Sequence, residues 1–395
     1  MVRRLKKYLI TKLQSKKYFD VYFIYRIQLY YLNRLEGTRK KVFQIAKLSD
    51  LKPFKNILKG YEYKSSAQDG LKVKVPDLNL YELKNVIIHS RSSAVIKGRK
   101  IYYESINDNE RFNEGHIISH TQTNSLINLK SVEEIEEGFF LAGNGSFNWY
   151  HWLIEILPKM IYFKDVPVKT ILVDESCQLI PSMMASLKIF TNHLNIKIID
   201  LDKNKSYKIK KLFFINEVNK LMYNDLESKL NIKPLFYFRK ESLEQFREIF
   251  FKNNSSNYHS AEKIYLERRN THRIAENENQ IWEFLQQKNF TGVDLTTHSF
   301  CEQISIFEKA KIIVGTTGAA FTNLLFCKPH SQAIIFMPDN YKNYNYYQEL
   351  GLMLDLKINY LYYKNGEDLH DQSNFEIDLL ELKSLLESYE KTALS

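Results

Sequence analysis

Short apolar segments that alternate with helical stretches constrain the fold of this chain more than any other feature. Each segment is typical of a buried strand, and a longer helical stretch follows most of them. Repetition of this kind requires a parallel sheet with helices on both faces, so the expected fold class is α/β. The predicted strands are residues 170–174, 196–200, 211–215, 263–267, 290–295, 311–315, 332–337 and 357–363, and the predicted helices are residues 179–194, 240–252, 276–288, 299–309, 318–326, 343–354 and 375–392.

Local signals refine two helices. Ser299, with Glu302 three residues later, has the pattern of a capping box, so a helix is expected to begin there. An earlier helix is predicted over residues 148–163. Pro158 lies inside it and is expected to kink it, because proline lacks a backbone N–H and crowds the preceding turn.

A chain of 395 residues is too long for a single ordinary hydrophobic core, so we expect two domains with extensions. We expect a basic, aromatic and helical N-terminal extension over residues 1–84. A first α/β domain is expected over residues 85–225 and a second over residues 226–365. A C-terminal amphipathic helix is expected over residues 366–395, and the hinge between the domains within residues 216–240.

The positive charge of the chain is confined to its start. Residues 1–41 contain twelve Lys or Arg and two acidic residues, which accounts for the whole net charge of +10. The neutral remainder argues against a nucleic-acid-binding surface on the main domains. The basic, aromatic arm can lie on an anionic membrane surface. Alternatively, it is a helix packed on the main body with a solvated basic face.

A histidine and a glutamate lie one turn apart on the predicted helix that follows a glycine-rich turn at residues 143–146. His151 and Glu155 are four residues apart, so they share one helix face. Aromatic side chains surround them: Trp149, Tyr150 and Trp152. A carboxylate beside a histidine in a partly dry site can act as a general base. An ordinary surface His–Glu pair is the alternative.

Two later segments together suggest a phosphate site. The strand at residues 311–315 runs into a turn of small residues at 315–320, where backbone N–H groups can approach an anion. Arginines follow the strand at residues 263–267, and a fork of guanidinium groups can clamp a diphosphate. They are Arg268, Arg269 and Arg273. Strand ends of one parallel sheet converge, so the segments can share one site. Alternatively, they are a tight turn and a solvated basic loop.

Cysteine and histidine spacing indicates neither a disulfide framework nor a metal site. Cys177, Cys301 and Cys327 are widely separated, which fits a reducing compartment. His116 and His120 have ligand-like spacing, but no glutamate and no third ligand accompany them, so no metal is expected. No signal peptide and no transmembrane helix are expected either.

The motifs taken in order resemble glycosyltransferase family 61, including bacterial members annotated for capsular polysaccharide biosynthesis. The first block matches at Tyr150, His151, Trp152, Glu155, Leu157, Pro158 and Lys159; the second at Arg268, Arg269, Arg273, Asn277 and Glu278; and the third at Gly315, Gly318, Ala319, Thr322 and Asn323. The resemblance covers about residues 85–365. Thr317 stands where the family usually has a histidine between the two glycines, a departure that implies altered donor use, weaker catalysis or an inactive relative.

The resemblance implies a GT-B-like arrangement of two Rossmann-like domains facing a cleft. The first domain is then the acceptor side, and the second binds the nucleotide-sugar. The implied reaction is inverting and metal-independent. It needs no cofactor, and a UDP-sugar is the expected donor. The acceptor is a growing capsular or lipopolysaccharide glycan, free or lipid-linked. The expected location is cytoplasmic, with the arm holding the enzyme at the inner membrane face. No nucleic-acid partner is implied.

Roles for individual residues follow from the same resemblance. Glu155 is the expected base, with His151 orienting or replacing it. The expected diphosphate-binding residues are Arg268, Arg269, Arg273, Gly315, Thr316, Thr317, Gly318, Ala319, Ala320 and Asn323, and the expected acceptor-side residues are Asn144, Asn148, Tyr150 and Trp152. Because of Thr317, a non-catalytic glycan- or nucleotide-binding relative of the transferase fold remains the alternative.

Overall fold

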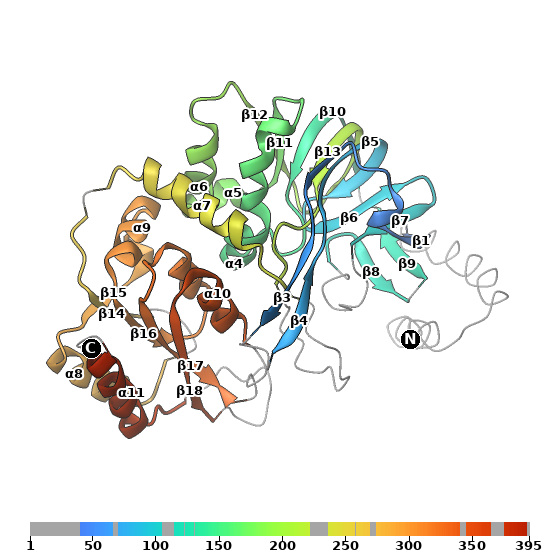
Figure 1. The fold of residues 1–395 in the computed structure, drawn as a ribbon. Coiled ribbons are helices and arrows are strands. Elements are labelled where there is room, and N and C mark those ends of the chain that lie inside the picture. The colour runs from blue at the N-terminus through green and yellow to red at the C-terminus, as the bar shows by residue number, and fades with distance from the viewer. Residues whose placement is uncertain are drawn as a thin grey trace. The chain divides into compact units, whose positions relative to one another are not determined.

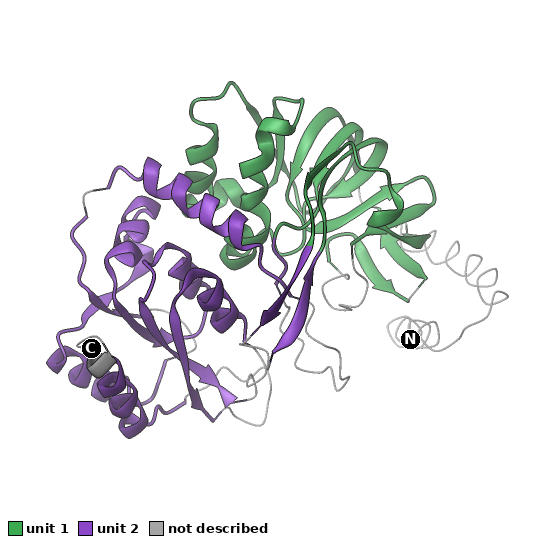
Figure 2. Cartoon of the chain, in the orientation of Figure 1, with its two compact units in different colours: residues 1–60, 76–218 green, residues 61–75, 219–395 purple. Residues whose placement is uncertain are grey.

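The structure is a computed structural model, and it describes residues 40–65, 70–104, 114–121, 123–129, 131–221, 236–256, 258–268, 274–339, 345–364 and 375–392. The chain divides into two compact units, which Figure 2 colours separately. Unit 1 comprises residues 1–60 and 76–218, and unit 2 comprises residues 61–75 and 219–395. The last change of unit, after Val218, falls within the predicted hinge range of residues 216–240.

Unit 1 is built on an eleven-stranded mixed sheet with the order β12-β11-β10-β13-β5-β6-β7-β1-β9-β8, in which β2 also pairs with β5. Four neighbouring strands, β12, β11, β10 and β13, are parallel, as the apolar segments predict. The strands are β1 (Lys40–Lys47), β2 (Lys55–Leu58), β5 (Leu78–His89), β6 (Ser92–Lys97), β7 (Lys100–Tyr103), β8 (Ile117–His120), β9 (Asn124–Asn128), β10 (Val132–Leu141), β11 (Thr170–Asp174), β12 (Lys197–Leu201) and β13 (Ser206–Ile215).

The expectation that residues 1–84 form an extension does not hold for residues 40–84. They contain β1, β2, the start of β5 and the hairpin of β3 (Tyr61–Ser65) and β4 (Leu71–Val75). β1 pairs with β7 and β9, so it belongs to the large sheet, whereas the hairpin belongs to unit 2. Residues 1–39, which carry most of the basic arm, lie outside the described residues.

The helical segment that carries His151 and Glu155 is irregular in a way that Pro158 explains. It begins as α4 (Trp149–His151), continues as the π turn η2 (Trp152–Ile156) and ends as the 3-10 segment η3 (Leu157–Asp165). The Leu157 N–H donates to the Trp152 carbonyl, a bond spanning five residues. Proline supplies no N–H and crowds the carbonyl four residues before it, so a wider turn relieves the conflict. The predicted kink takes this form.

Unit 2 contains a five-stranded parallel sheet with the order β15-β14-β16-β17-β18, which confirms the parallel α/β prediction. Numbered along the chain, this is the doubly wound order 2-1-3-4-5. The strand order reverses between β14 and β16, and ligands of such folds bind at this reversal. The strands are β14 (Lys263–Leu266), β15 (Thr291–Val293), β16 (Ile312–Thr316), β17 (Gln332–Pro338) and β18 (Lys357–Tyr363).

Helices cover both faces of this sheet (Figure 1). On one face, α8 (Glu278–Gln287) and α11 (Leu379–Thr392) share a core with alternate residues of the strands. The residues expected to form a separate C-terminal helix therefore belong to unit 2. The other face carries α7 (Lys240–Asn253), α9 (Phe300–Lys309), the 3-10 segment η5 (Ala319–Phe326) and α10 (Tyr346–Leu354). The capping box of Ser299 and Glu302 at the start of α9 is confirmed.

Candidate active site

His151 and Glu155 form a buried pair inside unit 1. The imidazole Nδ1 lies 2.7 Å from the carboxylate Oε2. His151 is 7% exposed and Glu155 is 3% exposed, so the alternative of a surface pair does not hold. A carboxylate in contact with Nδ1 fixes the orientation and the tautomer of the imidazole. The pair has the chemistry of an acid–base centre.

The glycine-rich turn packs directly against the imidazole. A Cβ at Gly145 would lie 2.5 Å from the Cγ and Cδ2 atoms of His151, and Gly145 has a φ of +71°. Both the close approach and the left-handed conformation require glycine. A Cβ at Gly143 would likewise lie 2.5 Å from the Ser93 hydroxyl. The turn therefore forms one wall around the pair.

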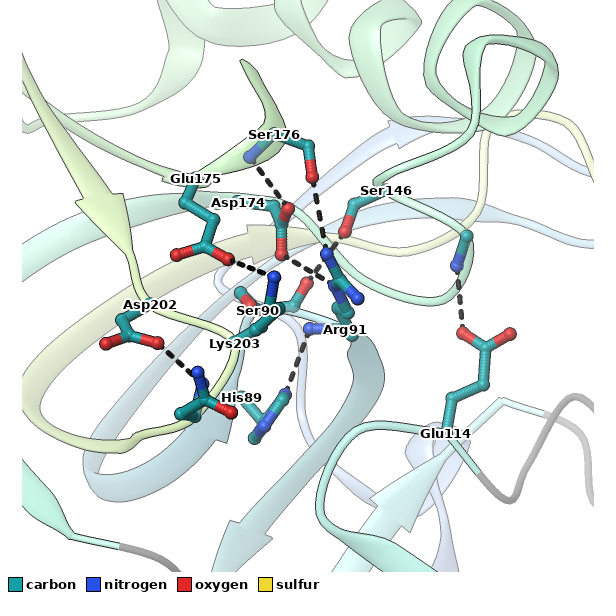
Figure 3. A network of polar contacts seen from close by, with 12 residues as sticks. His89, Ser90, Arg91, Glu114, Ser146, Asp174, Glu175, Ser176, Asp202 and Lys203 are labelled. Atoms are coloured by element: carbon teal, nitrogen blue, oxygen red, sulfur yellow. Dashed lines mark hydrogen bonds and ion pairs between the residues drawn. The ribbon is translucent and has the colours of Figure 1, made fainter. Parts of the chain in front are cut away.

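A hairpin between β5 and β6 holds the turn in place. The Ser90 carbonyl accepts hydrogen bonds from the Gly143 N–H at 2.9 Å and from the Ser146 hydroxyl at 3.0 Å. Glu114 accepts from the Gly145 N–H at 2.9 Å (Figure 3). The sequence motifs do not indicate Ser90 or Glu114. The sole signal for Ser90 is the serine-rich break between two strand-like segments, and no local pattern indicates Glu114.

The four residues expected on the acceptor side differ in exposure. Asn144, Tyr150 and Trp152 are buried, whereas Asn148 is exposed. Asn144 accepts from the Ser93 N–H at 2.5 Å, and the Trp152 indole donates to the Ser186 hydroxyl at 3.0 Å. Asn148 caps α4 by accepting from the Tyr150 N–H at 2.9 Å. Asn144 and Trp152 thus support the site from inside.

In unit 2, the structure brings Arg268 and the small-residue turn together, as predicted. Arg268 follows β14, the turn follows β16, and these two strands are paired at the strand-order reversal. The Arg268 guanidinium donates to the Thr317 carbonyl. A Cβ at Gly318 would overlap that guanidinium, so a larger residue there would require Arg268 to move. Arg269 and Arg273 lie outside the described residues.

The turn itself has a buried and an accessible part. Gly315, Thr316 and Thr317 are buried, whereas Ala319 is exposed and Gly318 and Ala320 are partly exposed. The Thr317 N–H donates to the Phe336 carbonyl at 2.9 Å, and the Tyr347 hydroxyl donates to the Gly318 carbonyl at 2.7 Å. These bonds fix the backbone that an anion would meet.

Three further residues of the matched blocks make structural contacts. The Asn323 amide donates to Gln303 of α9 at 3.1 Å. The Asn277 side chain bonds both the N–H and the carbonyl of Ile377. Glu278 accepts from the Tyr265 hydroxyl at 2.6 Å, and burial raises the pKa of its carboxyl. These residues are held by partners within unit 2.

Two further findings concern the described part of the chain as a whole. Within it, no three His, Cys, Asp or Glu side chains gather in a way that could hold a metal ion. His116, one half of the ligand-like spacing, makes an edge-to-face contact with His89, with ring centroids 5.3 Å apart. Across the same residues, no helix has both the length and the apolarity that a membrane crossing needs.

Of the comparisons with known proteins, one finds no match and one finds a family. No curated protein matches the chain. The family model described as Glycosyltransferase 61 matches residues 149–334. The match begins in the helical segment of His151 and Glu155 and extends past Arg268 and the turn after β16 into β17. Residues 149–334 therefore form a glycosyltransferase family 61 segment, and this segment supports a glycosyltransferase enzyme.

Proposed function

We propose that this glycosyltransferase moves a sugar from a nucleotide-sugar, expected to be a UDP-sugar, to a hydroxyl group of a capsular or lipopolysaccharide glycan. The proposal includes inversion at the anomeric carbon, no need for a metal ion, and the GT-B-like arrangement that the family resemblance implies. The observation that carries it is the buried contact of 2.7 Å between His151 and Glu155. Such a pair supplies the base that an acceptor hydroxyl needs.

The pair has a defined role in the proposed reaction. The Glu155 carboxylate accepts a hydrogen bond from the Nδ1–H of His151. The Nε2 atom of His151 then takes the proton of the acceptor hydroxyl. The acceptor oxygen forms a bond to the anomeric carbon while the bond to the nucleotide diphosphate breaks. This assignment makes His151 the base and Glu155 its partner, the second of the two roles that the sequence leaves open. It is supported by the contact at Nδ1, because an Nδ1–H that donates to the carboxylate makes Nε2 the acceptor nitrogen of the ring.

The leaving diphosphate is assigned to unit 2. Arg268 and the backbone of residues 318–320 are its proposed partners, because guanidinium and N–H groups stabilise the charge that develops on a leaving phosphate. The placement of Arg268 on the turn at the strand-order reversal supports this. Arg269, Arg273, Thr316, Thr317 and the buried Asn323 complete the proposed set. Thr317 contributes a hydroxyl where family members usually carry histidine.

The basic arm of residues 1–41 has a proposed part as well. It would hold the enzyme on the anionic inner face of the membrane, close to a lipid-linked acceptor, with the rest of the chain in the cytoplasm. Its charge supports this, because twelve basic residues and two acidic residues lie in this stretch. Binding of wild type and a variant lacking residues 1–39 to anionic vesicles tests the assignment.

Nucleotide release tests the proposed activity. The full chain is incubated with UDP-glucose, UDP-galactose, UDP-N-acetylglucosamine and UDP-xylose, with magnesium or with chelator, and free UDP is measured. We expect UDP release from one of these donors in the presence of chelator and its loss in His151→Ala. Absence of both UDP binding and UDP release would overturn the proposal. UDP binding without turnover would instead identify the non-catalytic relative.

A further inference from the structure

Arg91 lies between the carboxyl end of β11 and the turn that leads to His151. Its Nε is 3.4 Å from Asp174 Oδ2, and its Nη2 is 3.4 Å from the Ser176 hydroxyl (Figure 3). Its guanidinium carbon lies 4.5 Å from the centroid of the Phe147 ring. The Arg91 side chain is 26% exposed, so part of the guanidinium can meet another molecule. The reaction proposed above uses none of these residues.

Asp174 holds the Arg91 side chain in position. Its side chain is 1% exposed, and its Oδ1 accepts from the Ser176 N–H at 2.9 Å. Arg91 Nε and Asp174 Oδ2 face each other, yet neither atom forms a hydrogen bond with a residue that the structure describes. A buried carboxylate needs a compensating positive charge nearby, so Asp174 determines where the Arg91 guanidinium lies. Its guanidinium retains donors for a ligand.

Phe147 provides an apolar surface beside this cation. The residue is 40% exposed, although large apolar side chains are usually buried. It directly precedes Asn148, the N-cap of α4, so the helix start fixes its backbone. The guanidinium lies over the ring, and 40% of the residue is nevertheless exposed. An exposed aromatic ring next to oriented polar donors is typical of a site for a partly apolar, hydroxyl-rich ligand.

The surrounding charges decide which ligand fits. Asp174, Glu175 and Asp202 contribute three carboxylates around the two cations Arg91 and Lys203 (Figure 3). Lys203 lies 3.2 Å from Glu175 and is thereby paired. The local charge is negative, so a phosphate or a uronic acid would be repelled. A neutral sugar has no such cost, and its hydroxyl groups can accept from the guanidinium.

We propose that Phe147 and Arg91 form a binding subsite for a neutral pyranose ring. The sugar stacks on Phe147, and its hydroxyl groups accept hydrogen bonds from Arg91. Asp174 and Ser176 are positioning residues that act through Arg91. The subsite rests on the proposed function in one respect, because the bound sugar is given the role of the acceptor. Its position supports this role, since Gly145 of the same turn touches His151.

Binding of simple glycosides to the full chain tests the subsite. The probes are methyl β-glucoside, methyl β-galactoside, methyl β-N-acetylglucosaminide and methyl α-mannoside, with methyl β-glucuronide as the anionic probe. Saturation-transfer NMR titrations give the affinities. We expect at least one neutral glycoside to bind and the glucuronide to bind more weakly. Phe147→Ala and Arg91→Met should each weaken binding by about tenfold, which corresponds to ~1.4 kcal/mol.

Control variants separate binding from folding. Phe54→Ala removes another exposed phenylalanine of unit 1, which is 53% exposed, and should leave glycoside binding unchanged. Arg91→Met leaves Asp174 unpaired and can destabilise the fold, whereas the exposed Phe147 can be removed safely. If Asp174 acts through Arg91, Asp174→Asn weakens binding in wild type and has no further effect in Arg91→Met.

The results distinguish this subsite from the proposed function. The subsite is overturned if no neutral glycoside binds wild type, if Phe147→Ala binds as wild type does, or if the glucuronide binds best. UDP binding and UDP release are measured in parallel. If both are absent while glycosides bind through Phe147, the proposed function fails and the subsite stands. If UDP is released but glycoside affinity is the same in Phe147→Ala as in wild type, the subsite fails and the proposed function stands.

Discussion

His151 Nδ1 and Glu155 Oε2 lie 2.7 Å apart across a turn in which the backbone changes from α to π hydrogen bonding. The π turn ends immediately before the 3-10 segment that contains Pro158. Single π turns occur often at functional sites. Proline thus shapes the backbone that carries Glu155, and the contact makes the two side chains one chemical unit.

Replacing either member of this pair should remove the benefit of both. We expect His151→Gln and Glu155→Gln each to lower turnover with a glycan acceptor by about 10²–10⁴-fold, the range of general base catalysis. The double variant should be no slower than the slower single variant, because residues that act as a unit are not additive. Single-turnover rates of UDP release measure this.

Ser186→Ala is the control for stability in this experiment. The Ser186 hydroxyl accepts a hydrogen bond from the buried indole of Trp152, which lies in the same helical segment as His151 and Glu155. Its removal should lower the free energy of unfolding by about 1–3 kcal/mol. Turnover of the folded enzyme should remain within a factor of a few. Multiplicative losses in the His151/Glu155 double variant would contradict the coupled pair.

Gly145→Ala should be more destabilising than Gly98→Ala, although both glycines have a left-handed backbone. Gly98 has a φ of +61° and no atom within 4 Å of an added Cβ, so its variant should cost about 1–2 kcal/mol. Gly145→Ala carries the same strain and also presses on His151, which should add about 1–3 kcal/mol. Urea unfolding compares the two variants. Equal costs would show that the imidazole moves aside freely.

The parallel strands were predictable because strands covered on both faces are apolar throughout. β11 and β18 have the predicted bounds. The convergence of Arg268 on the turn after β16 was predictable too, since carboxyl ends of neighbouring parallel strands meet. The end of η5 was placed correctly and its start one residue early, and the predicted helix is a 3-10 segment.

The strands within residues 40–75 and 117–128 were harder to predict. β4 reads Leu-Lys-Val-Lys-Val, and its buried valines alternate with exposed lysines, so it lacks the continuous apolar run that marks the parallel strands. The hydrogen bonds from the glycine turn to Ser90 and Glu114 join segments that are 31 to 56 residues apart in the chain. Local patterns do not reveal such contacts. Arg91 and Phe147 were missed for the same reason.

Arg268→Met should weaken UDP binding by about tenfold or more, because charge-assisted bonds to phosphate are among the strongest hydrogen bonds. Arg247→Met is a matched control. Arg247 also donates to a backbone carbonyl of unit 2, that of Cys327, away from the strand-order reversal. Its loss should lower stability and leave UDP affinity unchanged. Calorimetric titration with UDP measures both variants, and equal losses of affinity would assign Arg268 a structural role alone.

Glu278 should make the protein less stable as the pH rises. Burial raises the pKa of its carboxyl above the ordinary value of 4.5, and the nearby Glu267 adds to the rise. The folded state therefore holds the proton more tightly than the unfolded state does. The resulting stability is present in full below the unfolded pKa and is lost as the pH rises through the folded pKa. Glu278→Gln lacks this loss, and its amide oxygen can still accept from Tyr265.

Urea midpoints measured between pH 4 and pH 7 test the sign. The midpoint of Glu278→Gln relative to wild type should rise with pH. Glu302 supplies the opposite case, because hydrogen bonds from Ser299 lower the pKa of its carboxyl. The stability that Glu302 contributes is present above the unfolded pKa and is lost as the pH falls through the folded pKa. The urea midpoint of Glu302→Gln relative to wild type should therefore fall as the pH rises. If both variants shift in the same direction, the buried Glu278 carboxyl does not titrate as its surroundings require.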